Sequence, residues 1–331
     1  MPCYYPLEGW KSKNVNESGK RSVVFKRSEG FEDMPVRVPC GQCHGCRLER
    51  SRQWALRCVH EAQLHDQSSF ITLTYDDKHL PEGATLVKRD FQLFMKRLRK
   101  ALHPIKIRYF MCGEYGENAF QGTFSQDKRR RATQEKHLQQ YKISALGRPH
   151  YHAIIFGYDF PDREYLETRN GNHLFYSPML EQIWDKGFNT IGNVTFESAA
   201  YVARYVMKKI NGEESEMHYT RLDPDTGELI KVEPEYTTMS RKPGIASDWY
   251  DKYKEDCFPK DFVTVRGMKL KPPKFYSQKL EVEDDKLASI IKSRRRANAK
   301  AMEADNTLER LRAKEKVKLS KLQFLNRGLN Q

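Results

Sequence analysis

Residues 148–156 read RPHYHAIIF, and their alternating pattern predicts a β-strand that carries two histidines on one face. Strand side chains point to opposite faces in turn, so His150 and His152 share a face with Ile154. Two neutral imidazoles at this spacing can bind one divalent cation and leave other coordination positions open, as a catalytic site requires. The alternative is a strand whose histidines make only ordinary polar contacts.

The composition points to a nucleic-acid partner. The chain has 331 residues and a formal net charge of +14, and such an excess favours polyanions, most commonly nucleic acid. No stretch approaches the roughly 18 to 20 apolar residues of a membrane span, and the N-terminus lacks a secretory apolar segment. We therefore expect a soluble, cytosolic protein with no membrane partner.

A cysteine cluster near the N-terminus predicts a structural metal site. Cys40, Cys43 and Cys46 form a double C-x-x-C motif, and Cys3 can supply a fourth thiolate. Four thiolates are a common ligand set for structural zinc, which would fasten the N-terminal arm. His44 is the competing fourth ligand, and an iron-sulfur cluster is the competing metal centre.

Hydrophobic periodicity predicts the core elements. Expected helices lie at 47–65, 86–102, 178–186 and 197–210, and expected strands at 69–75, 105–112, 148–156 and 188–196. This order predicts an α+β fold, in which helices pack on one face of an antiparallel four- or five-stranded sheet. Residues 12–33 are expected to be loop-rich, 223–227 a turn between strands, and 263–267 part of a hairpin.

These elements suggest four segments. We expect a cysteine-rich knuckle with a basic helix at 1–66, a catalytic core at 67–212, a β-rich extension at 213–280, and a charged tail at 281–331 that is a long helix or partly disordered. Residues 118–147 interrupt the core as a basic insertion centred on the run KRRR at 128–131. The insertion is either a solvated loop or a DNA-contacting arm.

A tyrosine pair provides candidate nucleophiles. Tyr201 and Tyr205 are one helical turn apart and project from the same face, together with Lys208. Such a pair can be simple core packing. Beside a metal site, however, a phenol can attack a DNA phosphodiester to give a 5′ phosphotyrosine and a free 3′ hydroxyl. We expect Tyr205 to cut first, because Lys208 follows it by three residues and can stabilise the developing charge.

The predicted metal site needs an oxygen ligand. Glu114, at the end of the neighbouring expected strand, is the candidate for completing a Mg²⁺ or Mn²⁺ site with the two histidines, and Glu117 is the alternative. Basic residues beside these elements are candidates for contacting the DNA backbone: Arg47, Arg50, Arg57, Arg148, Arg204 and Lys209.

Taken together, these motifs resemble those of a known family. Residues 150–152 resemble the His-hydrophobic-His motif of HUH endonucleases, which have an RRM-like core, and residues 70–75 resemble their first strand motif. The pair Tyr201 and Tyr205 resembles the paired-tyrosine motif of rolling-circle replication initiators. The chain is most similar to the replication initiators of gokushoviruses, single-stranded DNA phages that share the segments at 40–46, 113–116 and 148–152. The resemblance runs from Cys3 to about Tyr276, and the insertion before Arg148 departs from it.

The resemblance implies origin nicking on viral DNA, displacement synthesis by a host polymerase, and circularisation of the genome. Its expected partners are single-stranded and replicative-form DNA and host polymerase and helicase, in the host bacterial cytoplasm. No G-x-x-x-x-G-K-S/T segment is present, so we expect no ATPase activity in the chain itself. A plasmid-type initiator, relaxase or transposase is the alternative enzyme, and a non-catalytic zinc-dependent DNA-binding protein is the alternative of a different class.

Overall fold

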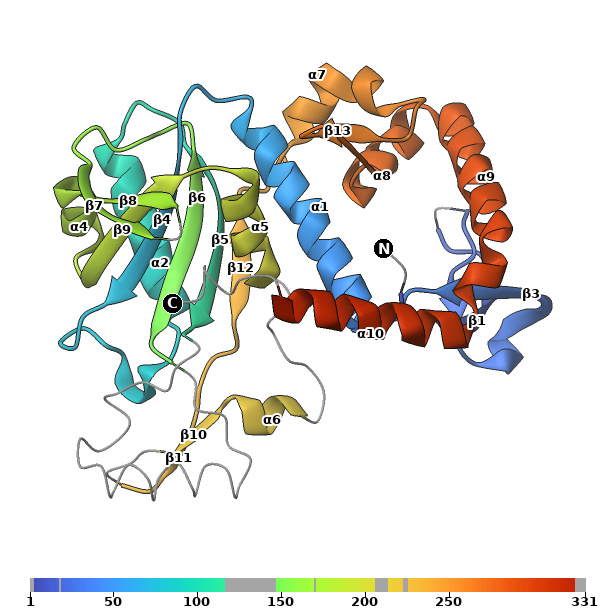
Figure 1. Ribbon diagram of the computed structural model, residues 1–331, viewed down its shortest axis with the longest axis horizontal. Coiled ribbons are helices and arrows are strands. Elements are labelled where there is room, and N and C mark those ends of the chain that lie inside the picture. Colours follow the sequence, from blue (N-terminus) through green and yellow to red (C-terminus); the bar gives the residue numbers. More distant parts are fainter. Residues whose placement is uncertain are drawn as a thin grey trace. The chain divides into compact units, whose positions relative to one another are not determined.

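The computed structural model describes residues 3–17, 19–116, 147–169, 171–205, 214–222 and 226–324 (Figure 1). The chain divides into two compact units. One contains residues 1–50 and 283–326, and the other contains residues 51–282. The four predicted segments and their boundaries stay predictions. No helix among the described residues is both long and apolar enough to cross a membrane.

A seven-stranded antiparallel sheet forms the centre of the larger unit. Its order is β12-β5-β6-β4-β9-β8-β7. The four central strands are the predicted ones: β5 (Arg108–Tyr115), β6 (Pro149–Phe156), β4 (Ser68–Tyr75) and β9 (Gly187–Asn193). The edges are β12 (Tyr236–Met239) and the hairpin of β7 (Glu164–Arg169) and β8 (Asn172–Tyr176). The α+β class is confirmed, but the sheet is larger than predicted because these edge strands are short or mostly polar.

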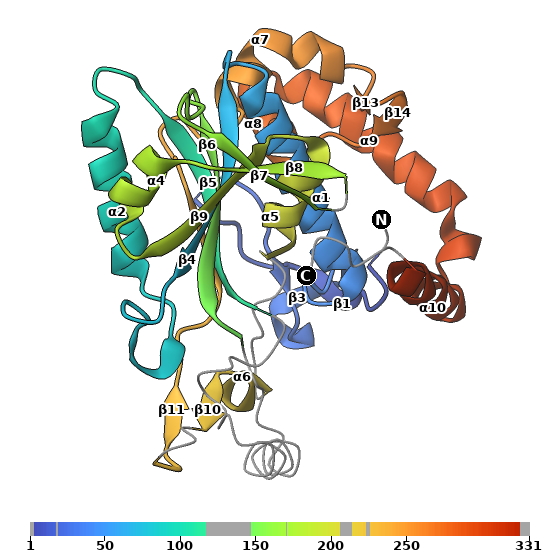
Figure 2. The same cartoon turned by 60° about the vertical axis from the view of Figure 1, so that its left-hand side comes forward.

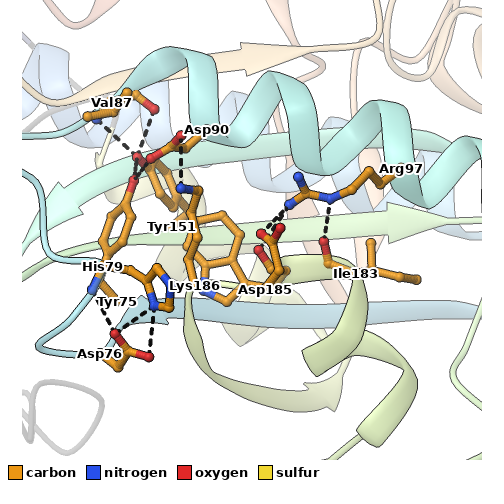
Figure 3. Close-up of polar contacts among 11 residues, drawn as sticks. Tyr75, Asp76, His79, Val87, Asp90, Arg97, Tyr151, Ile183, Asp185 and Lys186 are labelled. Atoms are coloured by element: carbon orange, nitrogen blue, oxygen red, sulfur yellow. Dashed lines mark hydrogen bonds and ion pairs between the residues drawn. The ribbon is translucent and has the colours of Figure 1, made fainter.

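Helices α2 (Lys88–Ala101) and α4 (Pro178–Trp184) cover one face of this sheet (Figure 2). Apolar residues of α2 recur at helical spacing, so Phe91, Phe94 and Leu98 are buried in the core under it. Polar contacts fasten the two helices, as Figure 3 shows: the Tyr75 hydroxyl donates to Asp90 over 2.8 Å, and Arg97 Nε donates to the Ile183 carbonyl over 2.8 Å.

The opposite face is also covered by helices, which corrects the prediction of helices on one face only. Helix α5 (Phe196–Tyr205) contacts β5 and β6. In α1 (His44–Ala62), the part from Ser51 belongs to the same unit, and the Trp54 ring lies 5.1 Å from that of Phe110 on β5. Periodicity shows that a helix has an apolar side but not which face of the sheet it covers.

The C-terminal part of the larger unit packs on α1 around a buried histidine. The His60 ring stacks on Trp249 with 3.6 Å between centroids, and its Nδ1 lies 2.7 Å from the Tyr276 hydroxyl. Burial lowers the pKa of His60 to about 3. The elements involved are α7 (Ser247–Cys257) and α8 (Lys274–Glu283), with the predicted hairpin between them as β13 (Val263–Val265) and β14 (Met268–Leu270).

The described part of the larger unit has four further short elements. The two strands expected on either side of 223–227 are present as the antiparallel pair β10 (Thr220–Leu222) and β11 (Leu229–Lys231), whereas residues 223–225 of the predicted turn lie outside the described residues. The other elements are the helix α6 (Glu214–His218) and the 3-10 turn η2 (Glu82–Ala84).

The smaller unit combines the N-terminal arm with the C-terminal helices. Its sheet has the order β2-β1-β3, with β1 (Leu7–Ser12), β2 (Val23–Val24) and β3 (Gly30–Val38). Its C-terminal helices are α9 (Asp285–Ala301) and α10 (Leu308–Phe324). Two 3-10 turns are η1 (Arg27–Glu29) and η4 (Glu303–Asn306). The prediction of a loop-rich segment at 12–33 missed β2, which has only two residues, and the start of β3, which reads GFED at 30–33. The predicted charged tail is helical over α9 and α10.

Candidate functional site

Strand register brings the predicted metal ligands together. On β5 and β6, Glu114 lies directly opposite His150, and Cys112 lies opposite His152. Directly opposite residues share a face of the sheet, so Glu114, His150 and His152 project from the same side. The predicted basic insertion, apart from residue 147, lies outside the described residues, as does Glu117.

The three side chains converge on one point. Glu114 Oε1 lies 2.8 Å from Nε2 of His150 and 2.8 Å from Nε2 of His152. One ligand atom from each residue lies within 4.8 Å of the other two, which is compatible with a shared metal ion. Glu114 is only 1% exposed. Metal binding by these residues stays a prediction.

Neighbouring groups fix both imidazole rings. The second ring nitrogen of His152, Nδ1, lies 2.9 Å from the Thr72 hydroxyl, and Nδ1 of His150 lies 3.0 Å from the Arg148 carbonyl. Such outer contacts orient a ring so that its other nitrogen faces the ligand position. The sequence reasoning missed Thr72, although the alternation of β4 places it on the histidine face.

The Glu114 carboxylate is held in its charged form. Burial by itself would raise its pKa, but the charges and hydrogen bonds of His150 and His152 outweigh burial and hold the pKa well below its ordinary range. An ionised carboxylate beside two imidazoles can bind a divalent cation.

One of the two predicted tyrosines lies at this site. The Tyr201 hydroxyl, on α5, lies 3.5 Å from Nε2 of His152. Its ring meets the His152 ring edge-on at 5.0 Å and the Phe70 ring at 6.2 Å. Tyr205 is the last residue of α5, but its side chain and that of Arg204 are outside the described part, as are Lys208 and Lys209. The predicted order of the two tyrosines stays a prediction.

The four predicted cysteines also lie together. In the smaller unit, the Sγ atoms of Cys3 and Cys40 are 3.5 Å apart, and those of Cys3 and Cys43 are 3.8 Å apart. One sulfur atom from each of Cys3, Cys40, Cys43 and Cys46 lies within 4.8 Å of the others, which is compatible with metal binding.

Backbone amides support this sulfur cluster. The amides of Tyr4 and Cys40 donate to Sγ of Cys43 and Cys3, respectively. Burial acts to raise the pKa of Cys43, but hydrogen bonds outweigh it and lower the pKa to about 7, which favours the thiolate. The alternative ligand His44 is outside this group, and its Nδ1 lies 3.8 Å from Glu315 Oε1.

The predicted DNA-contacting arginines have different surroundings. The Arg57 guanidinium lies about equally far from the rings of Trp54 (4.1 Å) and Phe275 (4.0 Å) and donates to the Ile245 carbonyl. This guanidinium therefore already joins α1 to the C-terminal part of its unit. Arg148 donates to the Tyr75 carbonyl over 2.8 Å and pairs with Asp77.

In the smaller unit, Arg50 is exposed and donates to the Gly41 carbonyl over 3.5 Å, and Arg47 is half-buried. DNA contact by Arg47, Arg50, Arg57 and Arg148 stays a prediction.

Comparisons with known proteins cover the residues of the candidate metal site. The model of a family described as "Replication-associated protein ORF2/G2P" matches residues 68–122 and 118–210. These matches include Glu114, both histidines and both tyrosines. No solved structure matches the chain significantly.

Three phage proteins are similar to the chain. Replication-associated protein VP4 of Bdellovibrio phage phiMH2K is 32% identical over 83% of this chain and 76% of its own length. Replication-associated protein ORF2 of Spiroplasma virus 4 is 30% identical over 91% of this chain and 87% of its own length. Replication-associated protein ORF4 of Chlamydia phage 1 is 31% identical over 52% of this chain and 38% of its own length. The chain belongs to the family of these phage replication-associated proteins, the gokushovirus-type replication initiators.

Proposed function

We propose that the protein starts rolling-circle replication by cutting and rejoining single-stranded DNA at the viral origin through a 5′ phosphotyrosine. One observation carries this proposal: Glu114 Oε1 lies 2.8 Å from Nε2 of both histidines, and the Tyr201 hydroxyl lies 3.5 Å from one of these nitrogens. A candidate nucleophile and three candidate metal ligands thus lie together on one face of the sheet.

The ligand set suits a catalytic divalent cation. Glu114, His150 and His152 would hold Mg²⁺ or Mn²⁺, with the remaining positions open to phosphate oxygens and water. When bound, the ion would polarise the phosphodiester and neutralise charge that develops on its oxygens.

The chain supplies the nucleophile. The tyrosine phenol loses its proton, and its oxygen forms a bond to phosphorus while the bond from phosphorus to the 3′ oxygen breaks. The 3′ oxygen gains a proton and leaves as a hydroxyl. One phosphodiester bond replaces another, so the reverse reaction rejoins DNA without ATP.

Two nucleophiles fit a two-cut cycle. After the first cut, one tyrosine stays attached to the displaced 5′ end, and the regenerated origin needs another. We propose Tyr201 for the first cut because its hydroxyl already lies at the site, and Tyr205, one turn further along α5, for the second. In the order inferred from the sequence, Tyr205 makes the first cut because of Lys208. We propose the opposite order because the Tyr201 hydroxyl lies 3.5 Å from Nε2 of His152.

For the cysteine cluster we propose structural zinc. Four thiolates held tetrahedrally at about 2.3 Å from one zinc ion lie about 3.8 Å from one another. The Sγ distances of 3.5 Å and 3.8 Å from Cys3 to Cys40 and Cys43 fit this arrangement. An iron-sulfur cluster places several iron and sulfide atoms between its cysteines and would need the sulfurs further apart.

The proposed partners follow from this cycle. The substrates are single-stranded and replicative-form DNA at the origin, and host polymerase and helicase would extend and unwind the nicked strand in the host bacterial cytoplasm.

An adduct assay tests the proposal. The protein is incubated with Mg²⁺ and labelled single strands that tile the viral genome, and denaturing electrophoresis detects covalently bound DNA. We expect one strand to give an adduct that His152→Ala abolishes, while salt-sensitive binding persists, because Lys and Arg contacts to phosphate do not need the ion. Binding without any adduct would favour a non-catalytic zinc-dependent DNA-binding protein.

A further inference from the structure

An exposed phenylalanine lies in line with the candidate metal site. Glu114 on β5 is opposite His150 on β6, His150 is opposite Thr74 on β4, and Thr74 is opposite Phe188 on β9. Directly opposite residues share a face, so these four side chains form one row across four adjacent strands. Phe188 therefore lies on the same face as the metal ligands.

The row fixes how far Phe188 lies from the site. Neighbouring strands are about 4.8 Å apart, so Phe188, two strands from His150, is about 10 Å away along the row. Only Thr74 stands between them, and a threonine side chain is short. A strand of DNA whose phosphodiester lies at the histidines can reach Phe188 with an adjoining nucleotide.

Phe188 is 66% exposed. Exposure alone would not indicate a binding site, because single exposed apolar side chains are common. On the face that carries the candidate metal ligands, however, an exposed ring can bind single-stranded DNA. Every DNA base has a flat apolar surface that stacks on an aromatic ring.

The backbone holds Phe188 in this place. Gly187 has a φ of +140°, and a Cβ there would lie 2.3 Å from the Asp76 amide nitrogen and 2.6 Å from the Thr74 carbonyl oxygen. Only glycine allows so close an approach to the end of β4. The Asp76 amide donates to the Lys186 carbonyl over 2.9 Å and closes this junction. The strand that presents Phe188 is therefore fixed against the strand that flanks the histidines.

We infer that Phe188 is a stacking platform for a base of the single-stranded DNA next to the phosphodiester that is cut. The inference rests on the proposed nicking function and adds a base-binding subsite to it. Stacking accepts any base, so the subsite would position the strand without choosing its sequence.

Binding measurements without cleavage test the subsite. Fluorescence anisotropy in buffer without added Mg²⁺ or Mn²⁺ compares a short labelled oligothymidine with an abasic strand of the same length. No chelator is used, so that the cysteine cluster keeps its metal. We expect Phe188→Ala to weaken oligothymidine binding about 5- to 100-fold, the effect of losing one stacked base, and to leave abasic-strand binding unchanged. The slope of affinity against salt should also stay the same, because no phosphate contact is lost. Phe188→Trp should retain binding.

Tyr165 offers a matched control. It is 62% exposed in the same sheet, but its row runs through Phe175 and Ile191 to Ile71, on the opposite face. Tyr165→Ala should leave binding of both strands unchanged. An equal loss in Tyr165→Ala, an equal loss on both strands, or no loss in Phe188→Ala would overturn the inference. A change in oligomeric state in place of DNA affinity would also overturn it and would show that a second copy covers the ring.

The nicking proposal and the stacking inference can be refuted independently of each other. Because the binding assay contains no free divalent metal, absence of an adduct in the cleavage assay would refute nicking and leave the measured stacking intact. If the protein forms an adduct but Phe188→Ala does not weaken oligothymidine binding more than abasic-strand binding, only the base-binding subsite is refuted.

Discussion

Glu114 Oε1 lies 2.8 Å from Nε2 of His150, its direct partner across β5 and β6. The two residues are 36 positions apart in the sequence, with the basic insertion between them. Strand pairing, and not sequence proximity, therefore determines which carboxylate faces the histidines. The pairing selects Glu114 because it is the residue directly opposite His150.

The first prediction concerns the charge of Glu114. Glu114→Gln keeps the size of the side chain but removes the negative charge that would bind the cation. We expect adduct formation at ordinary Mg²⁺ to fall about a hundredfold or more. Binding of single-stranded DNA should be nearly unchanged.

A second carboxylate serves as its control. Glu197, on α5, forms an exposed ion pair with Arg266, and such pairs contribute little to stability. Glu197→Gln should cut DNA like the unchanged protein. Full nicking by Glu114→Gln, measured at several Mg²⁺ concentrations, would remove Glu114 from the metal site.

The second prediction concerns the cysteine cluster. Cys43→Ser should lower bound zinc from about one ion per chain towards none and make the smaller unit more sensitive to protease, because binding free energy is linked to folding. Elemental analysis and limited proteolysis measure the two effects. Cys257→Ala, which changes a buried cysteine of α7, should keep its zinc. Iron with sulfide in the purified protein would contradict the zinc assignment.

Much of the core was predictable because its signals are local. Segments 68–75 and 149–156 show strand signals, namely side chains that alternate in polarity or many β-branched and aromatic residues. Helix α2 has an apolar stripe at helical spacing. The type of each element therefore follows from its own sequence. Glu114 lies beside the two histidines, as expected from its place near the end of a strand that was predicted to neighbour theirs, and metal binding by the three residues stays a prediction.

Other features depend on contacts that periodicity does not encode. β7 reads EYLETR and is mostly exposed, so it has no apolar face to reveal it. Arg57 looked like a surface arginine, yet Trp54 and Phe275, which flank its guanidinium, come from distant parts of the chain. Thr72 supports His152 only through the register of β4 and β6. Such long-range pairings cannot be read from a single sequence.

The third prediction concerns acid sensitivity. The pKa of buried His60 is lowered to about 3, whereas an unfolded histidine titrates near about 6.5. As the pH falls below about 6.5, His60 is therefore protonated in the unfolded chain but not in the folded protein. Because of this residue, the free energy of unfolding should decrease by up to about 1.4 kcal/mol per pH unit between these two pKa values. Stability contributed by the neutral ring is complete above about pH 6.5.

Chemical unfolding from pH 7 to pH 4 measures this effect. His60→Phe can still stack on Trp249 but cannot be protonated, so its free energy of unfolding should fall less steeply with acid. His173→Phe changes an exposed histidine of β8 and should keep the acid sensitivity of the unchanged protein. Parallel pH profiles for His60→Phe and the unchanged protein would contradict the prediction.

The last prediction separates the two tyrosines. Tyr201 lies at the histidines, whereas the order inferred from the sequence gave the first cut to Tyr205 because of Lys208. If Tyr201 cuts first, Tyr201→Phe should lose most initial adduct, about a hundredfold or more, because phenylalanine has no nucleophilic oxygen. Tyr205→Phe should still form the first adduct but release few unit circles. The variant with both changes should bind DNA and form no adduct.

Mass spectrometry of the DNA-linked peptide decides between the two orders. An initial adduct on Tyr205, with normal first cutting by Tyr201→Phe, would restore the order inferred from the sequence. Equal first cutting by both single variants would mean that the tyrosines are interchangeable. An adduct in the doubly changed protein would place the nucleophile elsewhere and leave Tyr201 as a residue that packs against Phe70 and His152.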